Sequence, residues 1–391
     1  MNVFVYTTVL VLILFYVGRK PLDKNFTIET EKTKIRDTNT LFFILGTLLL
    51  VYVTGQRFDF GDTIAYWEIF TKAMPIDECI SSFSIGNEWL FQFYMSFIHT
   101  YISTDPRVFI EITSLITIFP LMYFLYNYSG DLKFAFYIFI MSGCWEHSMN
   151  GLRQYLATAI IVAGFQLLAN RKWYLFLPLV FIVAQIHTSA YIFLLLYFIT
   201  NTEACGKMTK FILAISILIV ITSPLTGGFV DNLLSGLDYG DRYSGQEWNS
   251  SINIFRVLVS VVPIVLAFFN KDLMKNKYKY YNTVFNMALF FTVFTMAGVF
   301  SSVYARFNIY FEVFSVLLLV WNVNEMVVNS KIPWIKNAAY ICYTLYFIYS
   351  SFLYIKSYLL MVWDGILITN FLLTAMDKYL GYKFLKGAAY E

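Results

Sequence analysis

The sequence predicts an all-α integral membrane protein that crosses the bilayer about 11–14 times as a single membrane domain, residues 1–391. Two features of the composition support this prediction. Hydrophobic residues make up 59% of the chain and charged residues only 14%, whereas soluble domains carry roughly 25% charged residues. A water-soluble protein could not cover so much apolar surface with so few charges.

Composition also excludes several classes of function. The net charge of +3 is small and dispersed, so no binding to nucleic acid is predicted. The four cysteines form no CxxC pair, and the three histidines form no HExxH or similar cluster. We therefore predict neither a metal site nor a disulfide framework, and no cofactor.

Apolar runs define the expected membrane crossings, because a spanning helix needs about 17–25 residues. The first run, Asn2–Gly18, has no preceding cationic segment and no small-residue cleavage site, so we expect a retained helix. Several later runs are short, which indicates tilted or broken helices that line a cavity. The further expected crossings are Thr38–Thr54, Glu88–Ile102, Arg107–Tyr126, Phe134–Trp145, Leu152–Leu168, Tyr174–Ile186, Ala190–Thr200, Phe211–Ile221, Ile252–Phe269, Val284–Phe300, Ile309–Trp321, Ala338–Ile355 and a weak one near Leu359–Thr374.

Basic loops orient these crossings. Arg19, Lys20, Lys24, Lys32, Lys34 and Arg36 place the first loop in the cytoplasm by the positive-inside rule. Basic residues near 171–172 and 271–279 mark further inner loops. The acidic segments 55–87 and 223–250 are then two long outer loops. Counting crossings between the basic loops gives one too many, so Glu88–Ile102 or Phe134–Trp145 must be re-entrant or interfacial, and we favour Glu88–Ile102.

Unusual polar residues collect at the predicted outer face, first in the segment Arg57-Phe-Asp59-Phe-Gly-Asp62. Asp62 and Tyr66 are four residues apart and share one face if the segment is helical. One interpretation is an anion site beside a carboxylate that acts on a sugar hydroxyl. The alternative is an ordinary polar loop in which Asp59 orients Arg57.

Three arginines at this face, Arg57, Arg153 and Arg306, form a candidate phosphate site. The planar guanidinium group binds phosphate through two parallel hydrogen bonds, and a lipid-linked diphosphate carries its phosphates at this depth. For Arg153 and Arg306 the alternative is that the side chain only reaches the lipid headgroups.

Glu88 and His187 complete the candidate residues. Glu88 opens an apolar run, where a carboxylate is often only a helix cap or dipole partner. His187 lies in the polar turn Gln185-Ile-His187-Thr188-Ser189 within an apolar hairpin. An unperturbed histidine pKa near 6.5 suits a general base, although a lone histidine is more often a hydrogen-bonded structural residue.

From about Gly55 to Phe311 the chain resembles the EpsG/Wzy-type polysaccharide polymerases of bacterial membranes. No single motif is specific to this family, but the combination of several motifs in this order, at this spacing and at one membrane face is. The resemblance is carried by Arg57-Phe-Asp-Phe-Gly-Asp62 with Tyr66, Glu88, Leu152-Arg153-Gln154-Tyr-Leu-Ala157, His187-Thr-Ser-Ala190, and Arg306 with Tyr310-Phe311.

The resemblance implies an enzyme of the bacterial inner membrane whose active site faces the periplasm or the cell exterior. Such proteins transfer a growing glycan from undecaprenyl diphosphate to the end of an incoming lipid-linked repeat unit, and they look similar to the metal-independent C-type glycosyltransferases. Membrane lipids and a chain-length regulator protein are further expected partners. The implied roles are diphosphate binding for Arg153, Arg306 and Arg57, base or acceptor positioning for Asp62, His187 and Glu88, and sugar binding for Asp59, Tyr66 and Tyr310.

Three alternative functions would account for part of this sequence. A flippase for the same lipid-linked sugar would also have arginines in a cavity, but would need a pathway open to both faces. A membrane acyltransferase that modifies a surface glycan could use His187 as its base, but no paired motif lies near the cytoplasmic side. A structural membrane partner without chemistry does not account for the cluster of polar residues at the outer face.

Overall fold

The computed structural model describes residues 2–20, 35–58, 60–84, 88–218, 253–299 and 302–363. In these ranges the regular structure is helical, and the only β feature is an isolated bridge between Arg19 and Thr38. The chain divides into two compact units, Met1–Asn337 and Ala338–Glu391. In its described part the second unit is a stretch of helix α19 (Trp334–Trp363). The first unit holds the other helices and all candidate site residues. The predicted all-α fold is therefore confirmed.

The first two helices, α1 (Asn2–Val17) and α2 (Thr40–Gly55), form an antiparallel pair. The amide of Asn39, the N-cap of α2, donates to the carbonyl of Gly18 across the turn at 2.8 Å. A Cβ atom at Gly46 would lie 2.5 Å from the Phe15 ring, so the helices meet where glycine leaves room. Phe4 in the first turns of α1 stacks on Trp145, whose Nε1 donates to Thr54 near the end of α2.

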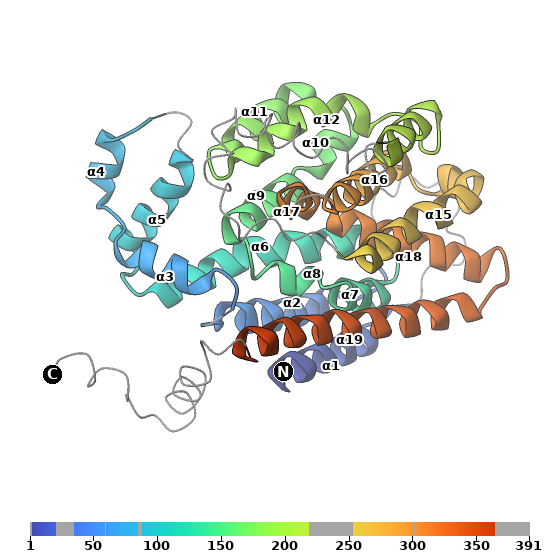
Figure 1. Ribbon diagram of the computed structural model, residues 1–391, viewed down its shortest axis with the longest axis horizontal. Helices are drawn as coiled ribbons and strands as arrows, with labels where there is room; N and C mark the ends of the chain where they lie inside the picture. Colours follow the sequence, from blue (N-terminus) through green and yellow to red (C-terminus); the bar gives the residue numbers. More distant parts are fainter. Residues whose placement is uncertain are drawn as a thin grey trace. The chain divides into compact units, whose positions relative to one another are not determined.

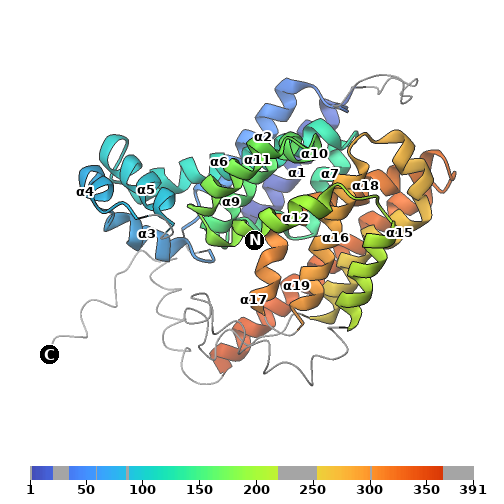
Figure 2. The ribbon, with the colours of Figure 1, turned by 90° about the horizontal axis from the view of Figure 1, so that it is seen from above.

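Helix α6 (Pro106–Tyr128) lies at the centre of the first unit and packs against both α2 and α9 (Leu152–Ala163). Between them in sequence, α7 (Leu132–Met141) returns alongside α1 and leads into the short α8 (Cys144–His147). Figure 2 shows α2, α6 and α9 in succession. We call the end where α2 stops and α9 begins the Arg153 end, and the opposite end, where α15 stops, the Lys277 end.

Residues 56–105 leave and return at the Arg153 end. Gln56 Nε2 donates to Glu111 Oε1 at 2.6 Å, so the end of α2 lies beside the second turn of α6. The intervening helices, α3 (Thr63–Thr71), α4 (Ile76–Ser81) and α5 (Trp89–Tyr101), lie around the start of α6 in Figure 1. Which of Glu88–Ile102 and Phe134–Trp145 does not cross the bilayer stays a prediction.

In the second half of the unit, helices α15, α16 and α18 pack against one another, and α16 also contacts α12 and the turn η3. Residues 207–218 are helical as well. The bounds are α10 Phe165–Ala169, α11 Trp173–Ala184, η1 Thr188–Tyr191, α12 Ile192–Thr200, α15 Ile254–Lys277, α16 Tyr281–Ala297, α17 Ser302–Arg306, η3 Phe307–Tyr310 and α18 Glu312–Val328.

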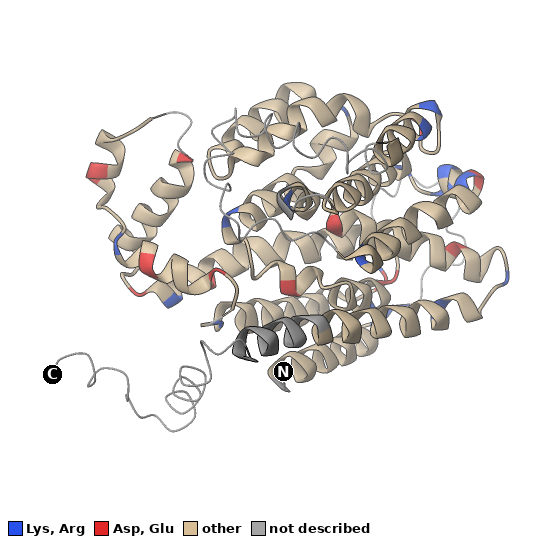
Figure 3. Cartoon of the chain, in the orientation of Figure 1, with Lys and Arg blue, Asp and Glu red and all other residues tan. Residues whose placement is uncertain are grey.

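Two of the described helices, α6 and α15, are long and apolar enough to cross a membrane on their own. A third span results if Tyr304–Tyr310 and Glu312–Val328, which meet at a bend of 60°, are counted as one. Seven more apolar helices have 10–17 residues, among them Leu152–Ala163 and Trp173–Ala184. The sequence analysis expected such short helices. Figure 3 shows charged residues mainly near helix ends, with central turns free of charge.

The Lys277 end is closed by buried ion pairs. Lys277 Nζ lies 2.5 Å from Glu325 Oε1, and Tyr278 donates to the same carboxylate at 3.0 Å. Lys336 pairs with Asp131, whose Oδ1 also accepts from the amide of Phe134 at the start of α7. The first pair joins the end of α15 to α18, and the second joins Lys336 to the residue that precedes α7.

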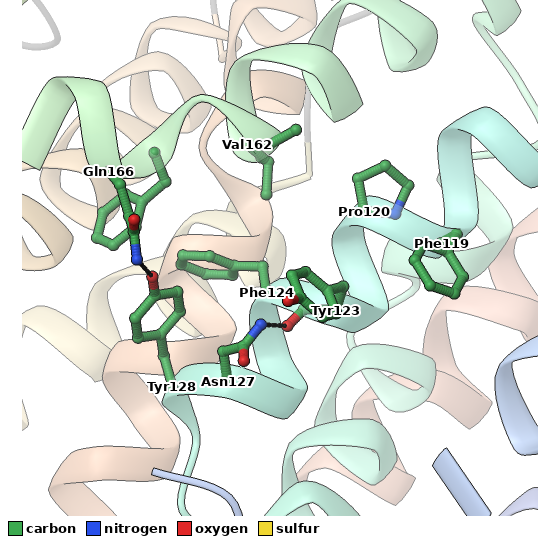
Figure 4. A pocket seen from close by; sticks show the side chains of 10 residues that line it. Phe119, Pro120, Tyr123, Phe124, Asn127, Tyr128, Val162 and Gln166 are labelled. Carbon is green, nitrogen blue, oxygen red and sulfur yellow. Dashed lines mark hydrogen bonds between the residues drawn. The ribbon is translucent and has the colours of Figure 1, made fainter. Parts of the chain in front are cut away.

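A cavity of about 310 Å³ lies beside the second half of α6, against α9 and α10. Phe119, Tyr123 and Phe124 supply an aromatic wall, and Asn127 and Gln166 supply polar groups at one end (Figure 4). Gln166 donates to the hydroxyl of Tyr128 at 3.0 Å. None of the residues singled out in the sequence lines this cavity, so the candidate site must be sought elsewhere.

Candidate functional site

The candidate site is built around the first turn of α9. Gly151 precedes the helix with a φ of +87°, a left-handed conformation that glycine adopts without strain. The amides of Gly151 and Leu152 both donate to Oδ2 of Asp62, each at 2.9 Å. The first amides of a helix have no partner within the helix, so Asp62, from the loop before α3, completes the start of α9.

Arg57 and Asp62 form the second part of the site. Arg57 donates to the Thr54 carbonyl at 2.7 Å and to Ser114 Oγ at 2.8 Å. Burial lowers the pKa of the Arg57 guanidinium to about 10, and the nearby Asp62 partly opposes that shift, so Arg57 remains charged at neutral pH. Burial raises the pKa of the Asp62 carboxyl, against the effects of its backbone hydrogen bonds and of Arg57.

One oxygen of Asp62 is left over. Its Oδ1 atom is buried and has no hydrogen-bond partner among the described residues. An unsatisfied buried carboxylate oxygen is energetically unfavourable. Asp62 therefore combines an anchoring oxygen with a second oxygen that could accept a hydrogen bond from a ligand hydroxyl.

Arg153 and Glu88 form an ion pair at the centre of the site. Arg153 Nη1 donates to Oε2 of Glu88, and Arg153 Nε donates to the Tyr66 hydroxyl at 2.9 Å. Oε1 of Glu88 accepts from the backbone amide of Thr188 at 3.1 Å. Residues from α3, α9, η1 and the N-cap position of α5 thereby meet at this ion pair. Burial raises the pKa of the Tyr66 phenol to about 12, so it is neutral and can both donate and accept a hydrogen bond.

The contacts of Glu88 and Arg153 bear on the alternatives of a helix cap and of a side chain that only reaches the lipid headgroups. Glu88 precedes α5 in a left-handed conformation, and its side chain makes no capping hydrogen bond. Arg153 does not reach away from the protein, because its guanidinium packs near the Phe91 ring and pairs with Glu88. Glu88 is thus the N-cap residue of α5 by position, but its carboxylate makes no capping hydrogen bond, and the Arg153 guanidinium has partners within the protein.

His187 and Tyr310 are joined through Ser189. Ser189 Oγ lies 2.7 Å from Nδ1 of His187 and 2.8 Å from the Tyr310 hydroxyl. His187 also caps η1, where the Ser189 amide donates to the same ring nitrogen at 3.3 Å. The Arg306 carbonyl accepts from Gln154 Nε2 at 2.6 Å. The sequence-predicted residues Arg57, Asp62, Tyr66, Glu88, Arg153, His187, Arg306 and Tyr310 thus belong to segments that contact one another at the Arg153 end. Asp59 and loop 223–250 lie outside the described residues.

A second polar cluster at this end was missed by the sequence analysis. His147 Nδ1 lies 2.9 Å from Oε1 of Glu312, and Tyr155 donates to Oε2 of Glu312 at 2.9 Å. Arg256, in the first turn of α15, lies with Nη2 2.6 Å from Nε2 of His147. The sequence did hold a signal, because Arg256, like Arg153 and Arg306, stands before a long apolar run. In the structure Arg306 is the last residue of α17. Among the described residues no group of three or more His, Cys, Asp and Glu side chains could hold a metal ion.

The fold and the site together define the class of this protein. It is an all-helical, polytopic membrane protein whose short apolar helices bring paired arginines, carboxylates and histidines to one end. Comparison with protein families then identifies it more closely. The model of the EpsG family matches residues 40–367, which is most of the chain, so this protein belongs to the EpsG family. Comparisons with curated proteins and with solved structures gave no match.

Proposed function

We propose that this protein is a polysaccharide polymerase, a metal-independent glycosyltransferase that transfers a glycan from undecaprenyl diphosphate to the end of an incoming lipid-linked repeat unit. Membership of the EpsG family supports a polymerase-type role. We further propose that the Arg153 end faces the periplasm or cell exterior of a bacterial inner membrane. The dense basic residues near the Lys277 end support that orientation by the positive-inside rule.

The observation that carries the proposal is the Arg153–Glu88 pair, with Tyr66 and Thr188 as its further partners. The donor already carries a good leaving group, so the protein must orient it, stabilise the charge on the diphosphate and remove one hydroxyl proton. In this proposal Arg153 exchanges its contact with Glu88 for phosphate oxygens. Arg306 assists in binding the diphosphate, and Arg57 fixes the loop that carries Asp62.

Acceptor binding falls to the groups around this pair. The unsatisfied Oδ1 of Asp62 can accept from a sugar hydroxyl. Tyr310 and Ser189 form a hydroxyl chain next to His187, and Tyr66 presents a neutral phenol. Asp62, His187 and Glu88 therefore stand as groups that position the acceptor or take its proton, and Asp59, Tyr66 and Tyr310 as sugar-binding residues.

The test replaces Arg153 by alanine in the native host, with synthesis of the repeat unit intact. A polymerase lacking its diphosphate contact should leave single repeat units on the lipid or on a ligase acceptor, and the long glycan should disappear. Arg171→Ala is the matched control, because Arg171 lies at the other end of α9 and α10 and donates to the Asn201 carbonyl. That variant should keep long chains.

Other outcomes refute the proposal in favour of a named alternative. Repeat units trapped facing the cytoplasm would indicate a flippase. Normal long chains that lack acetyl groups would indicate an acyltransferase. Protein levels in the membrane, measured for each variant, separate loss of function from loss of the protein.

A further inference from the structure

The second cluster, His147, Glu312, Tyr155 and Arg256, lies at the Arg153 end but on another side of α9. Arg153 and Tyr155 are two residues apart, which is about 200° around a helix of 3.6 residues per turn. Arg153 points to Glu88, whereas Tyr155 points to Glu312 at the start of α18. The bond from Trp145 to Thr54 holds α8, and with it His147, beside the end of α2.

The contacts of His147 define which ring nitrogen carries the proton. Arginine only donates hydrogen bonds, so Nε2, 2.6 Å from Arg256 Nη2, must be the unprotonated acceptor. Nδ1, 2.9 Å from the Glu312 carboxylate, then carries the hydrogen and donates it. His147 is therefore a neutral imidazole held in one tautomer, with the lone pair of Nε2 directed at Arg256.

Glu312 is suited to hold that tautomer. Its side chain is 5% exposed, and both oxygens are used, one by His147 and the other by Tyr155. A buried carboxylate that orients an imidazole through Nδ1–H and stabilises the imidazolium is the arrangement found behind catalytic histidines on unrelated folds. The His147 side chain is 32% exposed, so solvent or a ligand can reach the ring.

Arg256 supplies the positive charge beside this base. Its guanidinium has five N–H donors, and the ring of His147 is its hydrogen-bond partner among the described residues. No carboxylate lies within ion-pair distance of Arg256 in the part of the chain that the structure describes. Arg153, in contrast, is already paired with Glu88.

On the basis of the polymerase function proposed above, we propose that Nε2 of His147 is the general base of glycan transfer. Glu312 is its positioning residue, and Arg256 binds the leaving diphosphate together with Arg153, which reaches it from the other side of the first turn of α9. His147 and Arg256 are adjacent. In the transfer the acceptor hydroxyl attacks the anomeric carbon from which the diphosphate departs, so the base and the diphosphate-binding cation must both lie within reach of that carbon. When Arg256 turns from Nε2 to the phosphate oxygens, the Nε2 lone pair becomes free to take the proton. Asp62, His187 and Glu88 then position the acceptor.

In the glycan transfer, the acceptor oxygen forms a bond to the anomeric carbon of the donor sugar, and its proton passes to Nε2 of His147. The bond from that carbon to the diphosphate oxygen breaks, and its electron pair leaves with the lipid diphosphate, whose added negative charge Arg256 neutralises. Glu312 stabilises the imidazolium, which later releases its proton to water.

The experiment uses the full-length protein in lipid vesicles, with lipid-linked units extracted from a host strain that lacks this chain. Elongation rates are compared for the wild type, His147→Ala, His147→Gln, His187→Ala and Glu312→Gln, each with and without added imidazole. His99→Ala is the matched control, because the ring of His99, in α5, packs on Phe70 of α3 and has no carboxylate partner among the described residues. Elution from a size-exclusion column in detergent reports whether each variant is folded.

We expect His147→Ala to lose about 100-fold or more in rate, as is typical for removal of a general base. Imidazole should restore part of that rate, because the alanine variant leaves room for it, but should not restore His147→Gln. Glu312→Gln should lose about tenfold or more, and His99→Ala should match the wild type.

Two results would overturn the assignment. One is a folded His147→Ala variant that keeps more than a third of the wild-type rate, or whose lost rate imidazole does not restore. The other is rescue by imidazole of His187→Ala in place of His147→Ala. Failure of the polymerase function itself looks different, because the wild-type protein would then make no chain longer than one unit in the same vesicles.

Discussion

The ion pair between Arg153 and Glu88 gives the most direct test of how the site is held together. The perturbation is a double-mutant cycle of Glu88→Gln, Arg153→Gln and the combined variant. Glutamine at position 88 keeps the shape of the side chain and an oxygen for the Thr188 amide, which Oε1 of Glu88 now accepts at 3.1 Å. The cycle therefore isolates the charge-assisted contact between the two side chains.

Exposure sets the expected magnitude. A hydrogen bond to a charged group contributes about 1.5–3 kcal/mol, and exposed ion pairs contribute about 0–1 kcal/mol. The Glu88 side chain is 9% exposed and that of Arg153 is 34% exposed, so the pair lies between these cases. We expect a coupling free energy of about 1–2 kcal/mol, larger than the average of roughly 0.6 kcal/mol for hydrogen bonds between membrane helices.

Reversible denaturation in a fixed detergent measures the free energy of unfolding for the four proteins. Each single variant should be destabilised, and the double variant should be less destabilised than the sum. Raising the salt concentration should reduce the coupling only slightly, since Glu88 is nearly buried. Strictly additive single losses, with coupling below about 0.3 kcal/mol, would refute the view that this pair joins α5 to α9.

Three further predictions concern stability at the Arg153 end. Because burial raises the folded-state pKa of Asp62 above 3.8, its ionised form destabilises the fold near pH 7, and this penalty disappears as the pH falls through the folded-state pKa. Unfolding at pH 7 and pH 5 should therefore show the wild type gaining stability toward low pH relative to Asp62→Asn, and parallel curves would contradict this. Gly61→Ala should destabilise by about 1–2 kcal/mol for its left-handed conformation alone, because φ is +57° and a Cβ would lie 2.8 Å from Asn150; thermal unfolding that matches the wild type would exclude it. Trp145→Phe should cost about 1 kcal/mol for the lost bond to Thr54, and Thr54→Val combined with it should add little, as measured by the same unfolding assay.

The fold class could be predicted because composition and apolar runs are local properties of the chain. Runs such as Arg107–Tyr126 and Ile252–Phe269 correspond closely to α6 and α15. That Glu88–Ile102 is the segment that does not cross stays a prediction. How many crossings the bilayer accommodates stays a prediction, because most of the apolar helices are shorter than 18 residues.

The site was partly predictable for a similar reason. Arginine at the start of an apolar helix is visible in sequence, and this rule found Arg153 and Arg306. Applied consistently, it would also have found Arg256. What sequence could not show is pairing across long separations, such as His147 with Glu312, which are 165 residues apart. Glu312 reads as an ordinary acidic residue in the first turn of a helix until its neighbours in space are known.

The first turn of α9 presents Arg153, Gln154 and Tyr155 in three directions about 100° apart. Each is tied to a different segment, by bonds to Glu88, to the Arg306 carbonyl and to Glu312. Two such attachments already determine how the helix is rotated about its axis, so the third is redundant for orientation. Gln154 could therefore be replaced without changing the rotation of α9 about its axis. A one-residue insertion after Arg153, in contrast, would turn the downstream side chains by about 100° relative to Arg153, so that Arg153 and Tyr155 could no longer reach Glu88 and Glu312 at the same time.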